Sequence, residues 1–128
     1  MYIQLVEKNR LTQPLYSFFE GISENLLLKI FNKFQSYVEH GDVYQCNSLK
    51  TLNSRIWKYK GTIYKLRVDN AKESARILFS KSKEGNLIII HGFLKSTRKT
   101  PKNEAHQAIG IYQSLEILST VLWEQPSI

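Results

Sequence analysis

The chain has 128 residues, and its 18 lysine and arginine side chains against 11 aspartate and glutamate give a formal net charge of +7. A chain of this length buries roughly two thirds of its unfolded surface, enough for one hydrophobic core, so we expect a single domain over residues 1–128. The charge favours an acidic partner such as nucleic acid or an acidic protein, although a basic surface that only maintains solubility would give the same total.

The residue types exclude several classes of protein. Cys46 is the only cysteine and cannot form a disulfide within the chain, and with three scattered histidines it gives no zinc-binding spacing. No apolar stretch approaches the ~20 residues needed to cross a bilayer, and the N-terminus lacks a signal-peptide pattern. We therefore expect a cytoplasmic protein that uses no metal or other cofactor and does not bind a membrane.

The first 40 residues predict a short strand and two helices. Tyr2 to Val6 alternates as a strand does, and Pro14 suits the first turn of a helix, where its missing N–H is not needed. Ser23 is placed to cap a second, longer helix, which Gly41 would end. Apolar side chains recur along this helix at helical spacing: Leu26, Leu27, Ile30, Phe31, Phe34, Tyr37 and Val38.

Residues 42–54 are polar and predict a connecting segment with at most a short turn of helix. Three segments rich in β-branched and aromatic residues follow: residues 55–59 continuing past Gly61 into Ile63 to Asp69, then Ala75 to Ser80, then Leu87 to His91. The short turns between them predict a meander of antiparallel strands.

The last predicted element is an amphipathic helix over Lys102 to Leu118, with Thr100 as its N-cap and Pro101 behind it. The residues after Leu118 could extend this helix. The order helix, helix, strands, helix indicates an α+β domain in which helices cover one side of an antiparallel sheet. The other face of such a sheet can stay open.

Cations gather on the predicted sheet and on the loop after its last strand. Lys65 and Arg67 share one face of their strand, and Arg76 could lie beside Arg67 across the hairpin. One contiguous cationic surface could therefore include Lys58, Lys60, Lys65, Arg67, Arg76, Lys95, Arg98 and Lys99. Cations on strands also serve to keep a face solvated or to prevent edge-to-edge pairing, so the spacing permits a nucleic-acid site without requiring one.

Cleavage of RNA without a metal needs a base for the 2′-hydroxyl, stabilisation of the phosphate and an acid for the leaving oxygen. Arginine and lysine can stabilise the phosphate. His91 has a suitable intrinsic pKa for proton exchange, although a histidine that ends an apolar strand is often structural. A lysine whose pKa is lowered by neighbouring cations is the alternative. Three aromatic rings could stack on bases or pack against a helix: Trp57, Tyr59 and Tyr64.

Three runs of sequence together resemble a known family. They read IYKLRVDN from Ile63, ARILFS from Ala75 and LIIIHGFLKSTRKTP from Leu87, and an alanine-containing helix follows. In this order they look like the phage-derived HigB-like branch of the RelE/ParE toxin superfamily, over about Leu49 to Tyr112. The resemblance implies a RelE-like α+β fold, in which two N-terminal helices pack on a curved antiparallel sheet of three to five strands that is followed by a C-terminal helix.

The resemblance also implies the toxin of a type II toxin–antitoxin system, of a kind that typically enters the ribosomal A site and cuts messenger RNA without a metal. Arg67 matches the arginine of the family's leucine–arginine motif, and Arg76 matches that of the next strand. Lys95 matches the first lysine after glycine–phenylalanine, and Lys99 the lysine before threonine–proline. Ser96 stands where many relatives have a second lysine.

We therefore predict a ribosome-dependent mRNA endonuclease that inhibits translation. Its predicted catalytic residues are Arg67, Arg76, Lys95 and His91, and its predicted RNA-binding residues are Lys58, Lys60, Lys65, Arg98 and Lys99. The expected partners are messenger RNA on the ribosome and a cognate antitoxin of the helix-turn-helix type. Two alternatives stay open: a ParE-like toxin of the same fold that inhibits gyrase, and a protein that binds RNA without cutting it.

Overall fold

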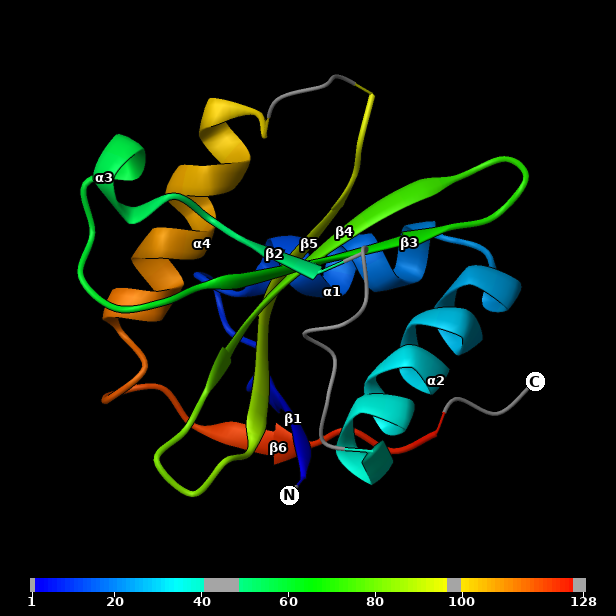
Figure 1. Cartoon of the computed structure of the whole chain (residues 1–128), viewed down its shortest axis with the longest axis horizontal. Helices are drawn as coiled ribbons and strands as arrows, with labels where there is room; N and C mark the ends of the chain where they lie inside the picture. Colours follow the sequence, from blue (N-terminus) through cyan, green and yellow to red (C-terminus); the bar gives the residue numbers. More distant parts are fainter. Residues whose placement is uncertain (1, 41–48, 97–99, 126–128) are drawn as a thin grey trace.

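The computed structural model describes residues 2–40, 49–96 and 100–125. Within these ranges the chain folds as an α+β structure around one mixed sheet (Figure 1). The strands are β1 (Ile3–Val6), β2 (Leu49–Thr51), β3 (Tyr64–Asp69), β4 (Ser74–Lys81), β5 (Leu87–Leu94) and β6 (Thr120–Leu122). The helices are α1 (Gln13–Gly21), α2 (Glu24–His40), α3 (Ser54–Trp57) and α4 (Lys102–Gln113).

The strand order in the sheet is β2-β3-β4-β5-β1-β6. The hairpins from β3 to β5 are antiparallel as predicted, whereas β1 lies parallel to β5, with Leu5 opposite Ile89. The prediction of three to five antiparallel strands was therefore too narrow, since the described residues form six strands and one parallel pair. The sequence did not reveal this pair because it joins segments separated by three helices and three strands.

Helices α1 and α2 cover one face of the sheet, and the hydrophobic core lies between them and the strands. The ring of Phe34 in α2 meets the ring of Phe79 in β4 edge to face, with 5.1 Å between ring centroids. Gly92 in β5 lies close to the ring of Phe18 in α1, on the side where any other residue would carry its Cβ. Ser23 caps α2 as predicted, because its Oγ accepts a hydrogen bond of 3.2 Å from the N–H of Leu26.

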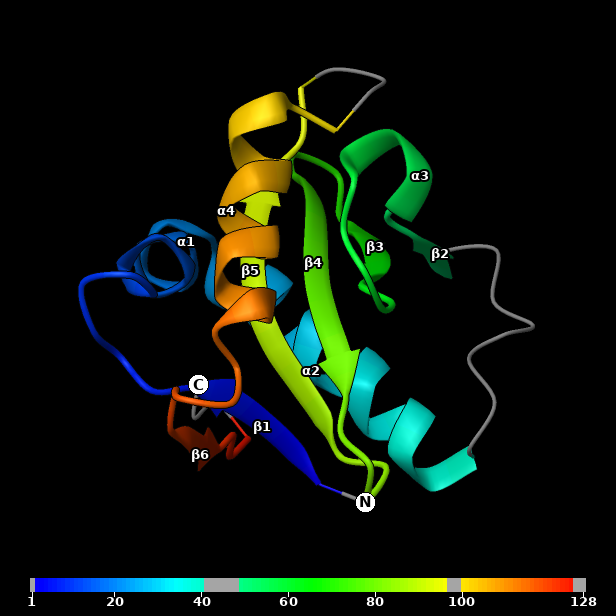
Figure 2. The same cartoon turned by 90° about the vertical axis from the view of Figure 1, so that its left-hand side faces the viewer.

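Helix α4 covers part of the opposite face of the sheet. In Figure 2 it lies in front of β5, while α2 lies behind β4. Glu104 in α4 contacts His91 in β5, and the rings of Trp57 in α3 and His106 in α4 meet edge to face. The expectation that helices cover one side of the sheet therefore holds for α1 and α2, whereas α4 lies on the other face, which is open only beside this helix.

Several local predictions need correction. Residues 55–59, expected in a strand, begin with the short helix α3, because the Asn53 side chain accepts hydrogen bonds from the N–H groups of Arg55 and Ile56. Helix α4 ends at Gln113, and residues 120–122 form strand β6 beside β1 instead of extending the helix. The predicted N-cap Thr100 does not cap α4; its hydroxyl binds Lys65.

Gly41 and Cys46 lie outside the described residues. None of the helices in the described ranges is long and apolar enough to cross a bilayer.

Candidate functional site

The open part of the sheet, on the face that α4 partly covers, holds a group of basic side chains that we call the cationic cluster: Lys50, Lys65, Arg67, Arg76 and Lys95. Lys50 in β2 lies opposite Lys65 in β3, and Arg67 in β3 lies opposite Arg76 in β4. Because directly opposed residues point to the same face, these four side chains share one surface. Lys95 follows β5, and its N–H donates to the carbonyl of Ser74 at the start of β4. The predicted neighbourhood of Arg67 and Arg76 is confirmed.

Asp69, at the end of β3, is the acidic side chain that contacts the arginines of the cluster. Its Oδ2 lies 2.6 Å from Nε of Arg67, and its Oδ1 lies 3.4 Å from Nη1 of Arg76. Burial raises the pKa of Asp69, but hydrogen bonds from Ser74 and Arg67 and the charges of the two arginines outweigh this effect and lower the pKa overall. Asp69 is therefore a carboxylate near neutral pH and neutralises part of the cluster.

The two arginines differ in exposure. The side chain of Arg76 is only 11% exposed, and its Nη1 also donates to Oγ of Ser74 and the carbonyl of Ala75, at 2.9 Å each. The side chain of Arg67 is 60% exposed. Arg67 can therefore contact a ligand directly, whereas Arg76 contributes a fixed charge beneath the surface.

The two lysines nearest the arginines have lowered pKa values. Burial is the main cause of the lowered pKa of Lys65, followed by the charges of Lys95, Arg76 and Lys50. Burial also lowers the pKa of Lys95, together with the charges of Arg76, Lys50 and Arg67. Nζ of Lys65 donates a hydrogen bond of 2.9 Å to Oγ1 of Thr100. Burial and the repulsion between cations thus leave each lysine neutral, and so able to accept a proton, at a lower pH than an isolated lysine.

His91, the predicted proton-exchange residue, lies inside the fold. The residue is 1% exposed, its Nε2 lies 3.3 Å from Oε2 of Glu104, and its Nδ1 has no hydrogen-bond partner among the described residues. Burial lowers its pKa, which the neighbouring Glu104 carboxylate only partly counteracts. His91 therefore lies beneath the cationic surface and links β5 to the first turn of α4.

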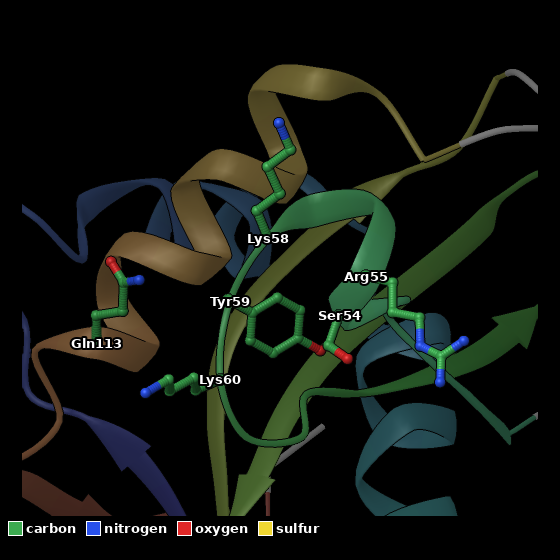
Figure 3. Close-up of a pocket in the computed structure, with 6 residues that line it drawn as sticks. All are labelled: Ser54, Arg55, Lys58, Tyr59, Lys60 and Gln113. Carbon is green, nitrogen blue, oxygen red and sulfur yellow. The ribbon is translucent and has the colours of Figure 1, made fainter.

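Lys58 and Lys60, which were also predicted to bind RNA, do not belong to the cationic cluster. Lys58 and Lys60 are exposed and line a separate recess beside α3 (Figure 3). Arg98 and Lys99 lie outside the described residues. The three aromatic rings proposed for base stacking pack against other rings: Trp57 against His106, Tyr59 against Tyr112 and Tyr64 against Phe79. The alternative that these rings pack against a helix is confirmed for Trp57 and Tyr59, since His106 and Tyr112 belong to α4.

Sequence reasoning missed Lys50, Asp69 and Thr100 as members of this site. Lys50 was missed because its short strand lies in a segment read as a connection. The alternation in β3 does place Asp69 on the face of Lys65 and Arg67, so this signal was present. No group of three or more histidine, cysteine, aspartate or glutamate side chains that could hold a metal ion occurs in the described part of the chain.

Comparison with known proteins places the chain in a family. No curated protein matches it. A family model described as phage derived protein Gp49-like (DUF891) matches residues 17–113, which span α2, β2 to β5, α3 and α4. This match covers about three quarters of the chain. The protein therefore belongs to the Gp49-like family, a family of type II toxins related to the RelE-like toxins.

Proposed function

We propose that this toxin is a ribosome-dependent mRNA endonuclease of the HigB-like type, which acts in the cytoplasm and inhibits translation. The observation that supports this proposal best is the cationic cluster, in which two lysines with lowered pKa values lie beside an exposed arginine. A single surface then offers both a phosphate-binding group and groups suited to proton transfer. Inhibition of gyrase would not require this combination.

The cluster supports a division of roles during cleavage. Arg67 would bind the scissile phosphate directly, and the buried charge of Arg76 would stabilise the negative charge that grows on it. A neutral Lys65 or Lys95 would take the proton of the 2′-hydroxyl, whose oxygen attacks the phosphorus. A protonated lysine would return a proton to the 5′-oxygen as its bond to phosphorus breaks. The products would be a 2′,3′-cyclic phosphate and a free 5′-hydroxyl.

His91 would have a different role from the predicted one. Because His91 is buried and its Nε2 contacts Glu104, it would position β5 and α4 and would not touch RNA. Lysine, the alternative base considered from the sequence, then replaces histidine in the proposed mechanism. Lys95 keeps its predicted place in the catalytic group, and Lys65 joins it from the RNA-binding group.

Membership of a toxin family implies an antitoxin partner. We propose a helix-turn-helix antitoxin with an acidic element that covers the cationic cluster. Opposite charge would draw the two proteins together and would block RNA from the same surface. A gene for a small helix-turn-helix protein beside the toxin gene would support this pairing.

The test is cleavage of a defined messenger RNA in a cell-free translation system, with cut sites mapped by primer extension. Wild-type protein should cut the message when ribosomes are present, and Arg67→Ala should reduce the rate roughly 100-fold, as loss of one group that stabilises the transition state does. The matched control is Lys83→Ala, which removes an exposed cation from the turn between β4 and β5. Circular dichroism should show that both variants fold.

Other results would reject the proposal in distinct ways. An intact message together with inhibited DNA supercoiling by gyrase would favour the ParE-like alternative. Binding of RNA that weakens steeply with salt, without any cut strand, would favour a protein that only holds RNA. If Arg67→Ala cuts the message at the wild-type rate, the cationic cluster does not take part in cleavage.

A further inference from the structure

A basic recess lies between α3, the loop that follows it and the end of α4 (Figure 3). Its volume is about 620 Å³, and the six lining residues that define it are Ser54, Arg55, Lys58, Tyr59, Lys60 and Gln113. Three of the six are cations and none is acidic. The recess therefore presents hydrogen-bond donors with positive charge and no carboxylate to neutralise them.

The floor of the basic recess is held firmly against α4. The hydroxyl of Tyr59 donates to the carbonyl of Leu52 at 2.5 Å and accepts from the N–H of Ile63 at 3.2 Å. The Tyr59 ring also meets the ring of Tyr112 edge to face, and Oη of Tyr112 accepts from the N–H of Thr62 at 3.1 Å. Because these contacts fix the loop in advance, a ligand bound here would pay little entropy for ordering it.

Gly61 brings this loop close to α4. Its φ of +104° lies in a region that side chains rarely adopt, and a Cβ at this position would overlap the Tyr112 side chain. The close approach sets the path of the chain between Lys60 and Thr62. The backbone that carries Lys60 is thus determined by packing on α4.

Lys58 has an unusual backbone conformation for a lysine. It follows the last turn of α3 with φ 55° and ψ 57°, in the left-handed region, and its N–H donates to the carbonyl of Ser54. Glycine or asparagine usually occupies this position after a helix, because a longer side chain is unfavourable there. The fold alone would therefore favour glycine, which indicates that the cation has a use beyond the fold.

The cations of the basic recess have no acidic partner in the described part of the chain. No carboxylate oxygen among the described residues lies within 4.0 Å of the charged nitrogens of Arg55, Lys58 or Lys60. A neighbouring hollow of about 430 Å³ shares Ser54, Arg55 and Tyr59 with the recess and extends to Thr51, the residue after Lys50 of the cationic cluster. The two basic surfaces are thus connected along the chain that leads from β2 into α3.

We propose that the basic recess binds the phosphodiester backbone of RNA, as an anchoring site in addition to the cationic cluster. Lysine and arginine side chains that line one recess without carboxylates suit the repeating negative charge of that backbone, and a rigid site suits contacts that do not depend on base sequence. The inference rests on the proposed function, because the RNA would be either the message or the RNA of the ribosome. Both carry the same phosphates.

The experiment compares two double variants, each of which loses one arginine and one lysine side chain. Arg55→Ala with Lys60→Ala removes two cations of the recess, and Arg10→Ala with Lys83→Ala removes one arginine and one lysine from exposed positions elsewhere. Dissociation constants are measured over a series of salt concentrations, for a labelled single-stranded RNA oligonucleotide and for ribosomes without message. The recess variant should bind roughly tenfold more weakly with a shallower salt dependence, and the control should bind more tightly than the recess variant.

The two RNA sources give different results. Weaker binding to the oligonucleotide assigns the recess to the message, and weaker binding to ribosomes alone assigns it to ribosomal RNA. If the recess variant matches the control in both measurements, the inference is wrong. Unchanged RNA binding with weaker binding to the antitoxin would also overturn it and would assign the recess to the antitoxin.

Lys58→Gly provides a test that separates binding from folding. Glycine suits the backbone at this position, so the melting temperature should equal or exceed that of the wild type while RNA affinity falls. A lower melting temperature with unchanged affinity would show that Lys58 is structural and would contradict the inference.

The inference and the proposed function can fail independently. If the wild type cuts no message but the recess variants bind RNA more weakly, the proposed function is wrong and the binding site stands. If the wild type cuts the message and the recess variants bind RNA as the wild type does, the proposed function stands and the inference about the recess is wrong. When both are right, recess variants should raise the RNA concentration needed for half-maximal cleavage, whereas Arg67→Ala should slow cleavage at every concentration.

Discussion

Arg67 and Arg76 lie directly opposite each other in the β3–β4 hairpin, and the single carboxylate of Asp69 contacts both guanidinium groups. One arginine side chain is 60% exposed and the other 11% exposed. The carboxylate reduces the repulsion between them and holds the buried arginine in place. The hairpin can therefore keep two like charges side by side, with only one of them presented to solvent.

Removal of this carboxylate should destabilise the fold. In Asp69→Ala the buried Arg76 loses its ionic partner, and we expect the free energy of unfolding to fall by about 1–2 kcal/mol, because Asp69 is itself partly exposed. Urea denaturation followed by circular dichroism measures this change. Glu116→Ala, at an exposed position, should stay within about 0.5 kcal/mol of the wild type. If the urea midpoint of Asp69→Ala equals that of the wild type, solvent fully replaces the interaction that Arg76 loses, and the prediction is wrong.

His91 should make stability depend on pH. Because burial lowers its pKa in the folded protein, the unfolded chain takes up the proton more readily. The free energy of unfolding should therefore fall as pH decreases below the ordinary histidine pKa near 6.5, by at most about 1.4 kcal/mol per pH unit. Denaturation between pH 7.5 and roughly 5 should give a flatter profile for His91→Gln than for the wild type. His40→Gln, at an exposed position, should retain the wild-type slope; equal slopes for all three proteins would contradict the prediction.

Two glycine-to-alanine substitutions should have opposite effects on stability. A Cβ at Gly92 would lie 2.6 Å from the Phe18 ring, so Gly92→Ala should push α1 from the sheet and lower the free energy of unfolding by about 1–3 kcal/mol. A Cβ at Gly110, inside α4, would meet nothing within 4 Å. Gly110→Ala should therefore raise the free energy of unfolding by about 0.5–1 kcal/mol through helix propensity. Thermal melting of both variants checks the pair, and a stabilised Gly92→Ala would refute the contact with Phe18.

If a lysine is the base, Lys50 should tune the pH dependence of cleavage. Its charge helps to lower the pKa of Lys65 and of Lys95, so Lys50→Ala should raise both pKa values. The rising limb of the pH–rate profile should then be displaced to higher pH, while the maximum rate changes little. Single-turnover rates between pH 6 and roughly 9.5 measure the displacement, with Lys83→Ala as the charge-matched control. If the pH–rate profile of Lys50→Ala equals that of the wild type, Lys65 and Lys95 do not transfer the proton.

Residue patterns within one element or between adjacent strands predicted much of this site. Alternation placed Lys65 and Arg67 on one face, and the short turn between β3 and β4 placed Arg76 opposite Arg67. Ser23 as the cap of α2 followed from the same kind of local chemistry. These features could be predicted because backbone geometry fixes which neighbours along the chain share a face.

Contacts between segments that are distant in the sequence could not be predicted from such local patterns. Trp57 and Tyr59 are of residue types that strands favour, yet a hydrogen-bonded cap at Asn53 begins a helix before them, and packing on α4 fixes the loop that follows. Lys58 and Lys60 consequently lie in a separate recess and not beside Arg67.

The sequence by itself determined the α+β class, the hairpin of paired arginines and the basic character of the surface, because each depends on short-range periodicity or on total charge. Only the tertiary structure decided that β1 lies parallel to β5, that His91 is buried against Glu104, and that Lys50 joins Lys65 and Lys95. These outcomes depend on how α4 and the strands pack across the sheet. Packing determines burial and the distance between charges, and these in turn determine which residue can exchange a proton.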